Sequence, residues 1–187
     1  MSSKLPDPAD PNDPPLPAPA IAGLSGFTCT LCAECCRGRQ VVRLNGDDLQ
    51  LLAEHAGLAD EAALAATGLI EHVHEEPGFS RPRLRFRSRP LRFCPFLQND
   101  LGEDGCLRGL CALHPRFKPL VCHLAPLARE VEDDGASFTE TWRMVAPVEG
   151  CPGMGRGSEP SLPVGEIRRR LDREVDWMRW RLGQAGQ

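Results

Sequence analysis

Hydrophobic positions recur along the chain with two periods, one typical of helices and one typical of strands. Apolar residues at helical spacing follow the turn signal of residues 45–47 and stop at Gly57, which predicts a capped helix. A second short helix is expected from a cap at Asp60 to about Gly68. These two helices lie in the first half of the chain and are separated by a short connection.

Alternation of apolar and polar residues predicts strands. In residues 81–89, arginines alternate with Leu84 and Phe86, which we expect to point inward. The arginines then form a charged outer face, a more common arrangement than a binding surface for phosphate or an acidic partner. His72 and His74 share one face of another alternating segment, which is typical of a solvated strand more often than of a metal site. Further strands and hairpin turns are predicted at residues 40–44, 71–76, 99–105, 127–132 and 138–144.

The last part of the chain predicts one long helix, from Pro163 to about Leu182. Its apolar stripe consists of Ile167, Leu171, Val175, Met178 and Leu182, and Trp177 and Trp180 are expected at the edge of that stripe. Many arginines occupy the other side. A helix docked on the domain is the expected arrangement, and a helix lying on a membrane surface is the alternative.

Composition limits the core and the classes of function. The 187 residues include 18 glycines, 18 prolines and no tyrosine, which predicts many turns, short elements and few large core side chains. Residues 1–23 are rich in proline and aspartate and are expected to be disordered. The net charge of −4 makes nucleic-acid binding unlikely. Without an apolar run of about 20 residues or a secretory segment, the chain is expected to be soluble and cytoplasmic.

Nine cysteines are the clearest chemical signal, and four of them fall within Cys29-x2-Cys32-x2-Cys35-Cys36. If this run is helical, Cys29, Cys32 and Cys36 lie within roughly 60° of one another on one face. Thiolates at such spacing bind zinc or iron–sulfur clusters. A remote fourth ligand is then needed, and Cys94-Pro95 and Cys151-Pro152 are the candidates.

Structural disulfides are the alternative interpretation of these cysteines. An odd number of cysteines and the adjacent pair Cys35-Cys36 argue against that alternative. In a reducing cytosol, cysteines at this spacing are more often metal ligands. His114 and His123 lie in the same motif as Cys111 and Cys122, and we expect them to bind the metal or to hydrogen-bond to its ligands.

Five sequence blocks in order resemble the CxxCxxCC cysteine-cluster family, described as zinc- or iron-chelating proteins. The blocks lie between Phe27 and about Gly157: the run Phe27–Cys36, Asp47-Asp48, Cys94-Pro95-Phe96-Leu97, the segment from Cys111 to Pro126, and Cys151-Pro152-Gly153-Met154-Gly155-x-Gly157. Two residues depart from the family pattern. His123 replaces the usual arginine after Cys122, and Cys106 has no counterpart.

This resemblance implies a metal or iron–sulfur centre in a cytoplasmic bacterial protein. One family relative, the flagellin lysine N-methylase, combines such a domain with S-adenosylmethionine, so that cofactor and a protein substrate are implied only by the resemblance. Neither a Gly-rich nucleotide loop after a clear strand nor the Cys-x3-Cys-x2-Cys spacing of radical enzymes occurs here.

Together, these patterns predict a small irregular α+β domain built around metal. It is expected to span residues 24–157, after the disordered tail of residues 1–23 and before a linker and the C-terminal amphipathic helix at residues 158–187. The expected function is iron–sulfur binding, with a 4Fe–4S cluster and zinc as an addition or replacement, for redox or protein modification. A zinc-stabilised interaction module and metal storage or delivery are the alternatives. The predicted metal ligands are Cys29, Cys32, Cys35, Cys36, Cys94, Cys111, Cys122 and Cys151.

Overall fold

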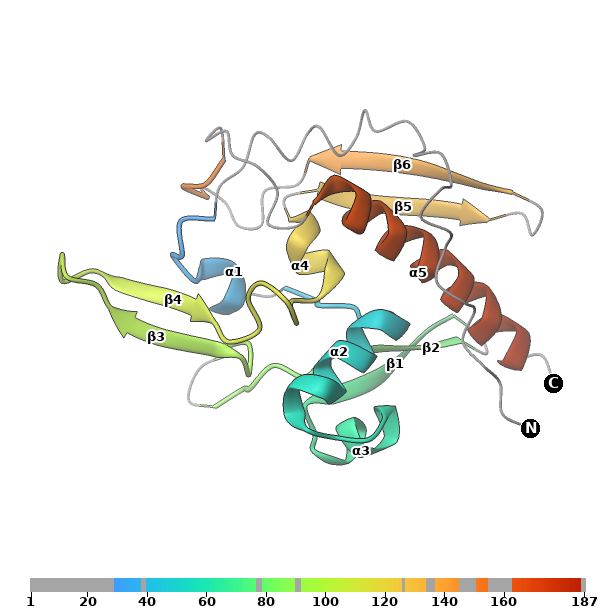
Figure 1. Cartoon of the computed structure of the whole chain (residues 1–187), viewed down its shortest axis with the longest axis horizontal. Helices are drawn as coiled ribbons and strands as arrows, with labels where there is room; N and C mark the ends of the chain where they lie inside the picture. The colour runs from blue at the N-terminus through green and yellow to red at the C-terminus, as the bar shows by residue number, and fades with distance from the viewer. Residues whose placement is uncertain are drawn as a thin grey trace.

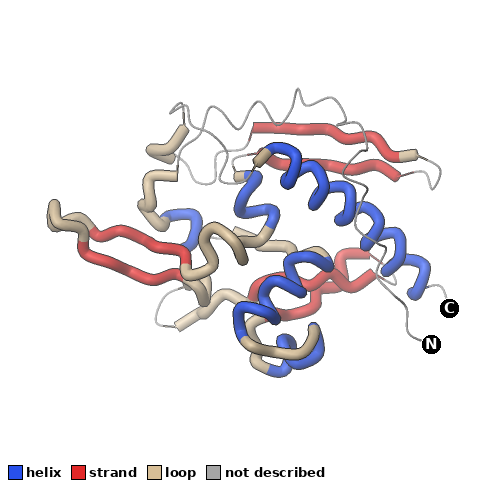
Figure 2. Tube along the Cα trace, viewed as in Figure 1, coloured by secondary structure: helices blue, strands red, loops and turns tan. Residues whose placement is uncertain are grey.

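The α+β class is confirmed by a computed structural model of the chain. It describes residues 29–37, 40–76, 79–89, 92–125, 127–133, 137–144, 151–154 and 163–185. Within these ranges it contains five helices and six strands, and the strands form three separate antiparallel pairs. Figure 2 shows the three hairpins, which are joined by helices and loops. The predicted disordered tail lies outside the described residues.

Two capped helices lie where the sequence predicts them. α2 (Gly46–Ala56) begins after Asn45, whose side chain accepts a hydrogen bond from Asp48 N, while Asp48 accepts one from Asn45 N. The helix ends at Gly57, where φ of +67° is a left-handed conformation that glycine adopts without strain. α3 (Glu61–Ala66) follows its cap residue Asp60.

The first hairpin pairs β1 (Ile70–Glu76) with β2 (Phe79–Leu84). β2 is shorter than the predicted strand 81–89, because its partner begins at Ile70, opposite Leu84. The predicted strand 40–44 is reduced to an isolated bridge between Arg43 and Arg83. His72 and His74 are exposed, as expected.

The arginines of β2 are less exposed than their alternating pattern predicts. Arg81 bonds Glu174 at 2.9 Å and its side chain is only 16% exposed. Arg83 bonds Glu71 at 2.7 Å. Carboxylates of the same chain thus pair with both of these guanidinium groups.

The other two strand pairs are also antiparallel. β3 (Leu97–Leu101) pairs with β4 (Leu107–Cys111), and β5 (Leu127–Asp133) pairs with β6 (Phe138–Met144). Two very short helices, α1 (Glu34–Arg37) and α4 (Leu120–Leu124), complete the described fold. The β3–β4 hairpin extends away from the body of the molecule (Figure 1).

α5 (Val164–Ala185) lies between the β5–β6 hairpin and the α2/β1–β2 part of the molecule (Figure 1). Ile167 and Leu171 are fully buried in one small apolar cluster with Leu120, Leu124 and Leu127. Val175 is also buried, whereas Leu182 is 47% exposed, so the predicted stripe is covered except at its end. Among the described helices, none combines the length and apolar composition needed to cross a bilayer.

Trp177 is buried, which corrects its predicted position at the edge of the stripe. It packs in the second apolar cluster, with Leu44, Leu52 and Leu64. Gly46 makes this packing feasible, because a Cβ atom there would lie 2.6 Å from Trp177 Cδ1. α5 therefore contributes to both apolar clusters.

Several arginines of α5 pair with acidic residues of other elements. Arg168 bonds Glu140 of β6 at 2.8 Å, and Arg179 bonds Asp133 of β5 at 2.7 Å. Arg173 pairs with Asp47 of α2. These contacts support the docked helix over the membrane-surface alternative.

Candidate metal-binding thiol sites

The cysteine run is not one helix, which corrects the prediction that Cys29, Cys32 and Cys36 share a helical face. Only residues 34–37 are helical, and Leu31 and Ala33 have φ of 58° and 63°. Non-glycine residues seldom adopt this left-handed conformation. The local direction of the chain therefore changes twice between Cys29 and Cys35.

Packing of the run against β4 accounts for these conformations. Gly109 N donates to Leu31 O at 2.7 Å, which ties the run to the strand. A Cβ atom on Gly109 would lie 2.1 Å from Ala33 Cβ, so only glycine allows so close an approach. A contact between residues more than seventy positions apart thus overrides the helical spacing of the cysteines.

Five thiols from distant parts of the sequence lie within electrostatic range of one another. We call them the inner thiol cluster, and they come from four segments: α1, the loop before β3, the end of β4, and α4 (Figure 1). Cys94 N donates to Cys36 O at 2.7 Å, which holds two of these segments together. The side chains of Cys94, Cys111 and Cys122 pack against the second apolar cluster, the one that contains Trp177. The inner thiol cluster consists of Cys35, Cys36, Cys94, Cys111 and Cys122.

The adjacent thiols of Cys35 and Cys36 share a hydrogen bond, with their sulfur atoms 4.0 Å apart. That bond lowers the pKa of Cys35 to about 6, and the Lys118 ammonium group acts in the same direction, against the effect of burial. The same bond raises the pKa of Cys36, and burial and the neighbouring Cys35, Cys94 and Cys122 raise it further. Without a metal ion, the shared proton therefore stays on Cys36, and Cys35 is the first of the pair to form a thiolate.

Burial and neighbouring thiols raise the pKa values of two further inner thiols, Cys94 and Cys122. Burial raises the pKa of Cys94 to about 11, and Cys111 and Cys35 add to the effect. Burial also raises the pKa of Cys122, again with contributions from Cys94 and Cys111. These mutual effects indicate that the thiols lie within electrostatic range of one another, and that a cation among them would relieve the repulsion.

A buried ion pair fixes the segment that carries Cys122. Asp48 accepts a hydrogen bond from Leu120 N at 2.9 Å and bonds Arg170 of α5 at 2.7 Å. Asp48 and Arg170 are 2% and 3% exposed. Burial raises the pKa of Asp48 to about 6, while Arg170 and the N–H groups of Leu120 and Asn45 oppose that shift.

The two histidines of the motif differ in their surroundings. His123 is buried, and burial, with Lys118 and Arg170 nearby, lowers its pKa to about 3. A neutral imidazole retains a nitrogen lone pair that can accept a hydrogen bond or bind a metal. His114 is exposed, and partial burial and Lys118 lower its pKa. A role for either histidine as a ligand stays a prediction.

Three further cysteines line a separate surface hollow of about 390 Å³, which we call the outer hollow. Cys29 and Cys32 enter from the cysteine run, and Cys106 enters from the turn before β4. Cys29 and Cys106 are exposed. The other lining residues are Thr30, Leu31, Asp104, Leu107 and Arg108.

Cys151 occupies the described segment 151–154, where Met154 N donates to Cys151 O at 3.2 Å. Its thiol is half-buried. Within the described residues, no contact places it in the inner thiol cluster or in the outer hollow. Its predicted role as a ligand stays a prediction.

All nine cysteines are free thiols. Across the described ranges, no group of three or more Cys, His, Asp or Glu side chains has the spacing to hold a metal ion as it stands. The inner cysteines are therefore gathered but not in coordination geometry.

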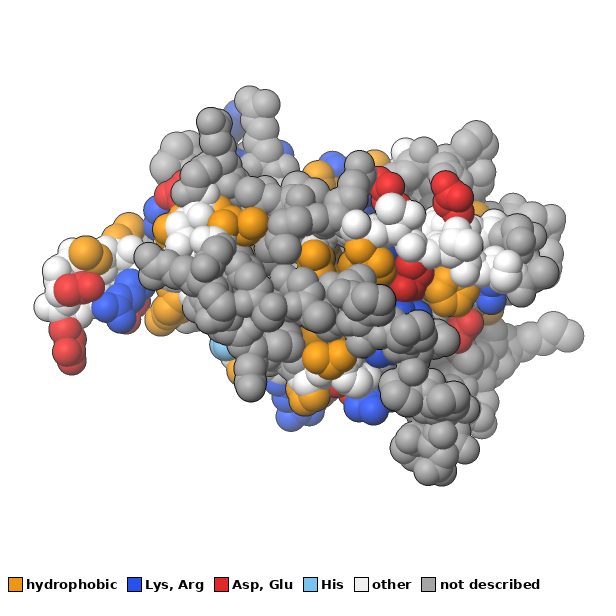
Figure 3. Space-filling view, turned by 90° about the horizontal axis from the view of Figure 1, so that it is seen from above, with side chains coloured by type: hydrophobic (Ala, Val, Ile, Leu, Met, Phe, Trp, Pro, Cys, Tyr) orange, Lys and Arg blue, Asp and Glu red, His pale blue; other side chains and the backbone are white. Residues whose placement is uncertain are grey.

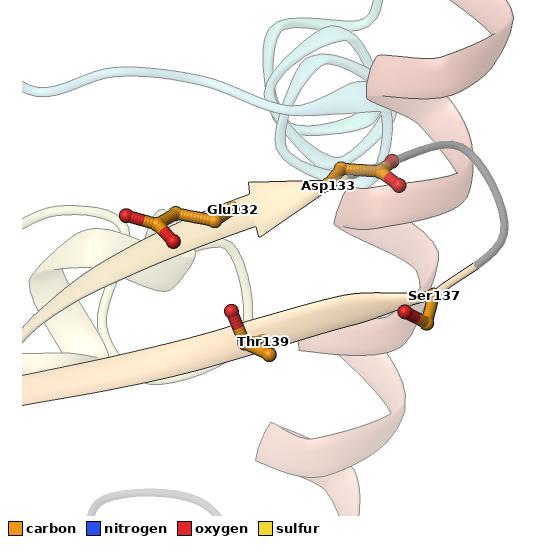
Figure 4. A pocket seen from close by; sticks show the side chains of 4 residues that line it. All are labelled: Glu132, Asp133, Ser137 and Thr139. Atoms are coloured by element: carbon orange, nitrogen blue, oxygen red, sulfur yellow. The ribbon is translucent and has the colours of Figure 1, made fainter.

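A different hollow, of about 220 Å³, lies at the β5–β6 turn and is lined by Glu132, Asp133, Ser137 and Thr139 (Figure 4). The carboxylates of Glu132 and Asp133 point in opposite directions along β5. Asp133 also bonds Arg179 of α5 with both oxygens. This hollow is therefore a weaker candidate than either thiol set.

Sequence reasoning did not predict the electrostatic effect of Lys118 on the cysteines, the pairing of Asp48 with Arg170, or the placement of Cys106. Lys118 lies only four residues from Cys122, so its charge beside a cysteine motif was a usable signal. The contact of Asp48 with Arg170 spans 122 positions, and no local pattern indicates it.

No family model, curated protein or solved structure matches this chain. The resemblance to the CxxCxxCC family therefore stays a prediction that depends on the sequence blocks alone.

Proposed function

We propose that this chain is a cysteine-ligated metalloprotein whose inner thiol cluster holds an iron–sulfur cluster used in electron transfer. The observation that supports this proposal most strongly is the gathering of five thiols from four chain segments. An iron–sulfur cluster of the four-iron type takes four cysteine ligands. Cys36, Cys94, Cys111 and Cys122 are the proposed ligands, because Cys94 and Cys122 both act on Cys36. On binding of a cation, the shared proton would move from Cys36 to Cys35, and Cys35 would then donate the hydrogen bond between the two sulfurs.

The donor set fits such a centre chemically. Thiolates are the soft ligands that iron–sulfur clusters and zinc prefer. Lys118 lowers the pKa of Cys35 and opposes the raised pKa of Cys122, so its ammonium group favours thiolates here. Packing of three of the cysteines against the apolar cluster limits solvent access, one of the factors that set a reduction potential.

When bound, an iron–sulfur cluster supplies one-electron redox chemistry. The residues of this chain would hold it, shield it and balance its charge. We do not extend the proposal to S-adenosylmethionine or to methyl transfer, because both depend on the resemblance alone.

Zinc in the same thiol cluster is the second candidate, and it would make the chain a metal-stabilised module without catalysis. The fold favours this candidate in one respect: its described apolar residues form two separate buried clusters, and its described strands form three separate two-stranded sheets and no larger one. A structural ion can supply stability that such clusters lack. An interaction role would need a surface other than Arg81 and Arg83, which pair internally.

Anaerobic purification followed by a visible spectrum and elemental analysis tests the proposal. A brown protein with about four irons and matching sulfide per chain is the expected result. Cys36→Ser should remove the colour, and the control Cys106→Ser should keep it. A colourless protein with stoichiometric zinc would replace the first candidate by the second, and variable occupancy would favour metal storage or delivery.

A further inference from the structure

The geometry points to a second metal site in the outer hollow: we propose that Cys29, Cys32 and Cys106 together bind one thiophilic divalent cation of the zinc class. This site goes beyond the iron–sulfur proposal. It uses none of the residues assigned to the inner thiol cluster, and it assigns a role to Cys106.

Two chain segments bring these thiols to one hollow of about 390 Å³. The cysteine run supplies Cys29 and Cys32, and the turn before β4 supplies Cys106. The two segments are held together by the bond from Gly109 N to Leu31 O, at 2.7 Å. The space-filling view shows the hairpin end as a projecting lobe with charged and apolar side chains on its surface (Figure 3).

The turn itself is well fixed. Asp104 accepts a hydrogen bond from Cys106 N at 3.1 Å and bonds Arg108 at 3.1 Å. Gly102 N donates to Cys106 O at 2.9 Å. Cys106 therefore has a defined backbone position beside the hollow. The cysteine run, which also lines the hollow, starts at Cys29, the first described residue.

The separation of the two thiol sets follows from the backbone of the run. Left-handed residues on both sides of Cys32 change the chain direction before Cys35 and Cys36. Cys35 and Cys36 interact with Cys94, whereas Cys29 and Cys32 line the hollow with Cys106. The backbone of the run therefore favours two separate sites over a single centre that uses the whole Cys29–Cys36 run.

Three thiolates and a water molecule can complete the tetrahedral shell of a zinc-class cation. Binding releases three thiol protons and leaves one net negative charge on the ion and its three thiolates. Arg108 and Asp104 line the same hollow and pair with each other, so together they add no net charge to it. The exposure of Cys29 and Cys106 and the water position make this ion exchangeable with solvent. The thiols must approach one another when the ion binds, since the described residues have no formed metal geometry.

Zinc titration of the reduced full chain tests the site. Native mass spectrometry counts the bound ions, and competition with a colorimetric chelator gives their affinities. We expect Cys106→Ser to remove one ion per chain, or to weaken it by more than the roughly 10- to 100-fold that loss of an outer partner causes. Cys29→Ser should give the same loss. The matched control is Leu107→Ala, which changes the lining of the same hollow without removing a ligand, and it should keep the ion.

Alkylation of the cysteines followed by peptide mapping provides a second measurement, which does not depend on counting bound ions. One equivalent of zinc beyond that held by the inner cluster should protect Cys29, Cys32 and Cys106 together. Zinc binding that Cys106→Ser leaves unchanged, or protection that spares Cys106, would overturn the proposal. The iron–sulfur proposal is judged separately, by the colour and iron content of Cys36→Ser, so the two can fail independently.

Discussion

The inner thiol cluster and the outer hollow use the same amino acid in opposite settings. The inner thiols are half-buried, interact with one another and lie against an apolar cluster, so burial and neighbouring sulfurs shift several of their pKa values. Two of the outer thiols are exposed, and all three line an open hollow with Arg108 and Asp104. Burial favours a permanent centre, whereas exposure favours exchange with solvent.

What holds each set also differs. The inner thiol cluster depends on long-range tertiary contacts, above all the buried pair of Asp48 and Arg170, which fixes the segment leading to Cys122. The outer hollow depends on one close approach, between Gly109 and Ala33. Changes to these contacts should therefore affect one set more than the other.

The largest expected effect is loss of the buried guanidinium group in Arg170→Ala. This change leaves the Asp48 carboxyl group buried without its partner, which typically costs about 3–5 kcal/mol of unfolding free energy. Urea unfolding at neutral pH measures the loss. The control Arg169→Ala removes an exposed pair with Glu166 and should change the free energy by no more than about 1 kcal/mol. Equal losses in the two variants would contradict the role given to Asp48 and Arg170.

The pH dependence of that pair gives the second effect. Because burial raises the pKa of Asp48 from 3.8 to about 6, the folded state binds this proton more tightly than the unfolded state. The stability that this carboxyl group contributes is fully present below about pH 4 and is lost as the pH rises through 6.

Comparison with Asp48→Asn isolates this titration, since the asparagine does not ionise. The unfolding free energy of the wild-type chain minus that of the variant should fall, by on the order of 2 kcal/mol, between pH 4 and pH 7. Urea unfolding of the metal-free chains at several pH values measures it. A difference that rises over this range would mean that Arg170, and not burial, controls the ionisation.

The third effect concerns the outer hollow. Gly109→Ala places a methyl group against Ala33, and overpacking of this kind typically costs about 1–3 kcal/mol. Zinc affinity at the outer hollow should fall in this variant, because the run that carries Cys29 and Cys32 is pushed away from β4. The control Gly183→Ala adds its Cβ atom in open space on α5 and should keep both stability and zinc affinity. Unchanged zinc affinity in Gly109→Ala would separate the hollow from this packing contact.

The local elements could be predicted from sequence, and the long-range arrangement could not. Contacts between near neighbours in the sequence set the ends of α2 and α3. α2 begins after Asn45 and ends at Gly57, and α3 begins after Asp60, so both helices follow from the local sequence. The connection between β3 and β4 follows in the same way from the turn residues predicted at 99–105. The cysteine run is different, because its helical spacing is overridden by Gly109, a residue more than seventy positions later. The same limit applies to Trp177 and Arg170, whose burial depends on where α5 docks.

The division of the thiols shows the same limit for the site. Sequence spacing could indicate that most cysteines bind metal, and the gathering of five of them is compatible with that interpretation. Spacing could not indicate that Cys29 and Cys32 line the same hollow as Cys106. That arrangement depends on two left-handed residues and on the docked β3–β4 hairpin.

The smallest effect distinguishes the two thiol sets by reactivity alone. The hydrogen bond from Cys36 lowers the pKa of Cys35 to about 6, so the alkylation rate of Cys35 in the metal-free chain should rise with a midpoint near pH 6. Cys36→Ala removes that bond and should move the midpoint back toward the ordinary range of thiols. Lys118→Gln removes only the weaker electrostatic contribution and should move it by less. Mass spectrometry of the Cys35 peptide across a pH series measures all three midpoints. A midpoint that Cys36→Ala leaves in place would mean that the inner thiols do not act on one another, and the comparison with the outer hollow would lose its basis.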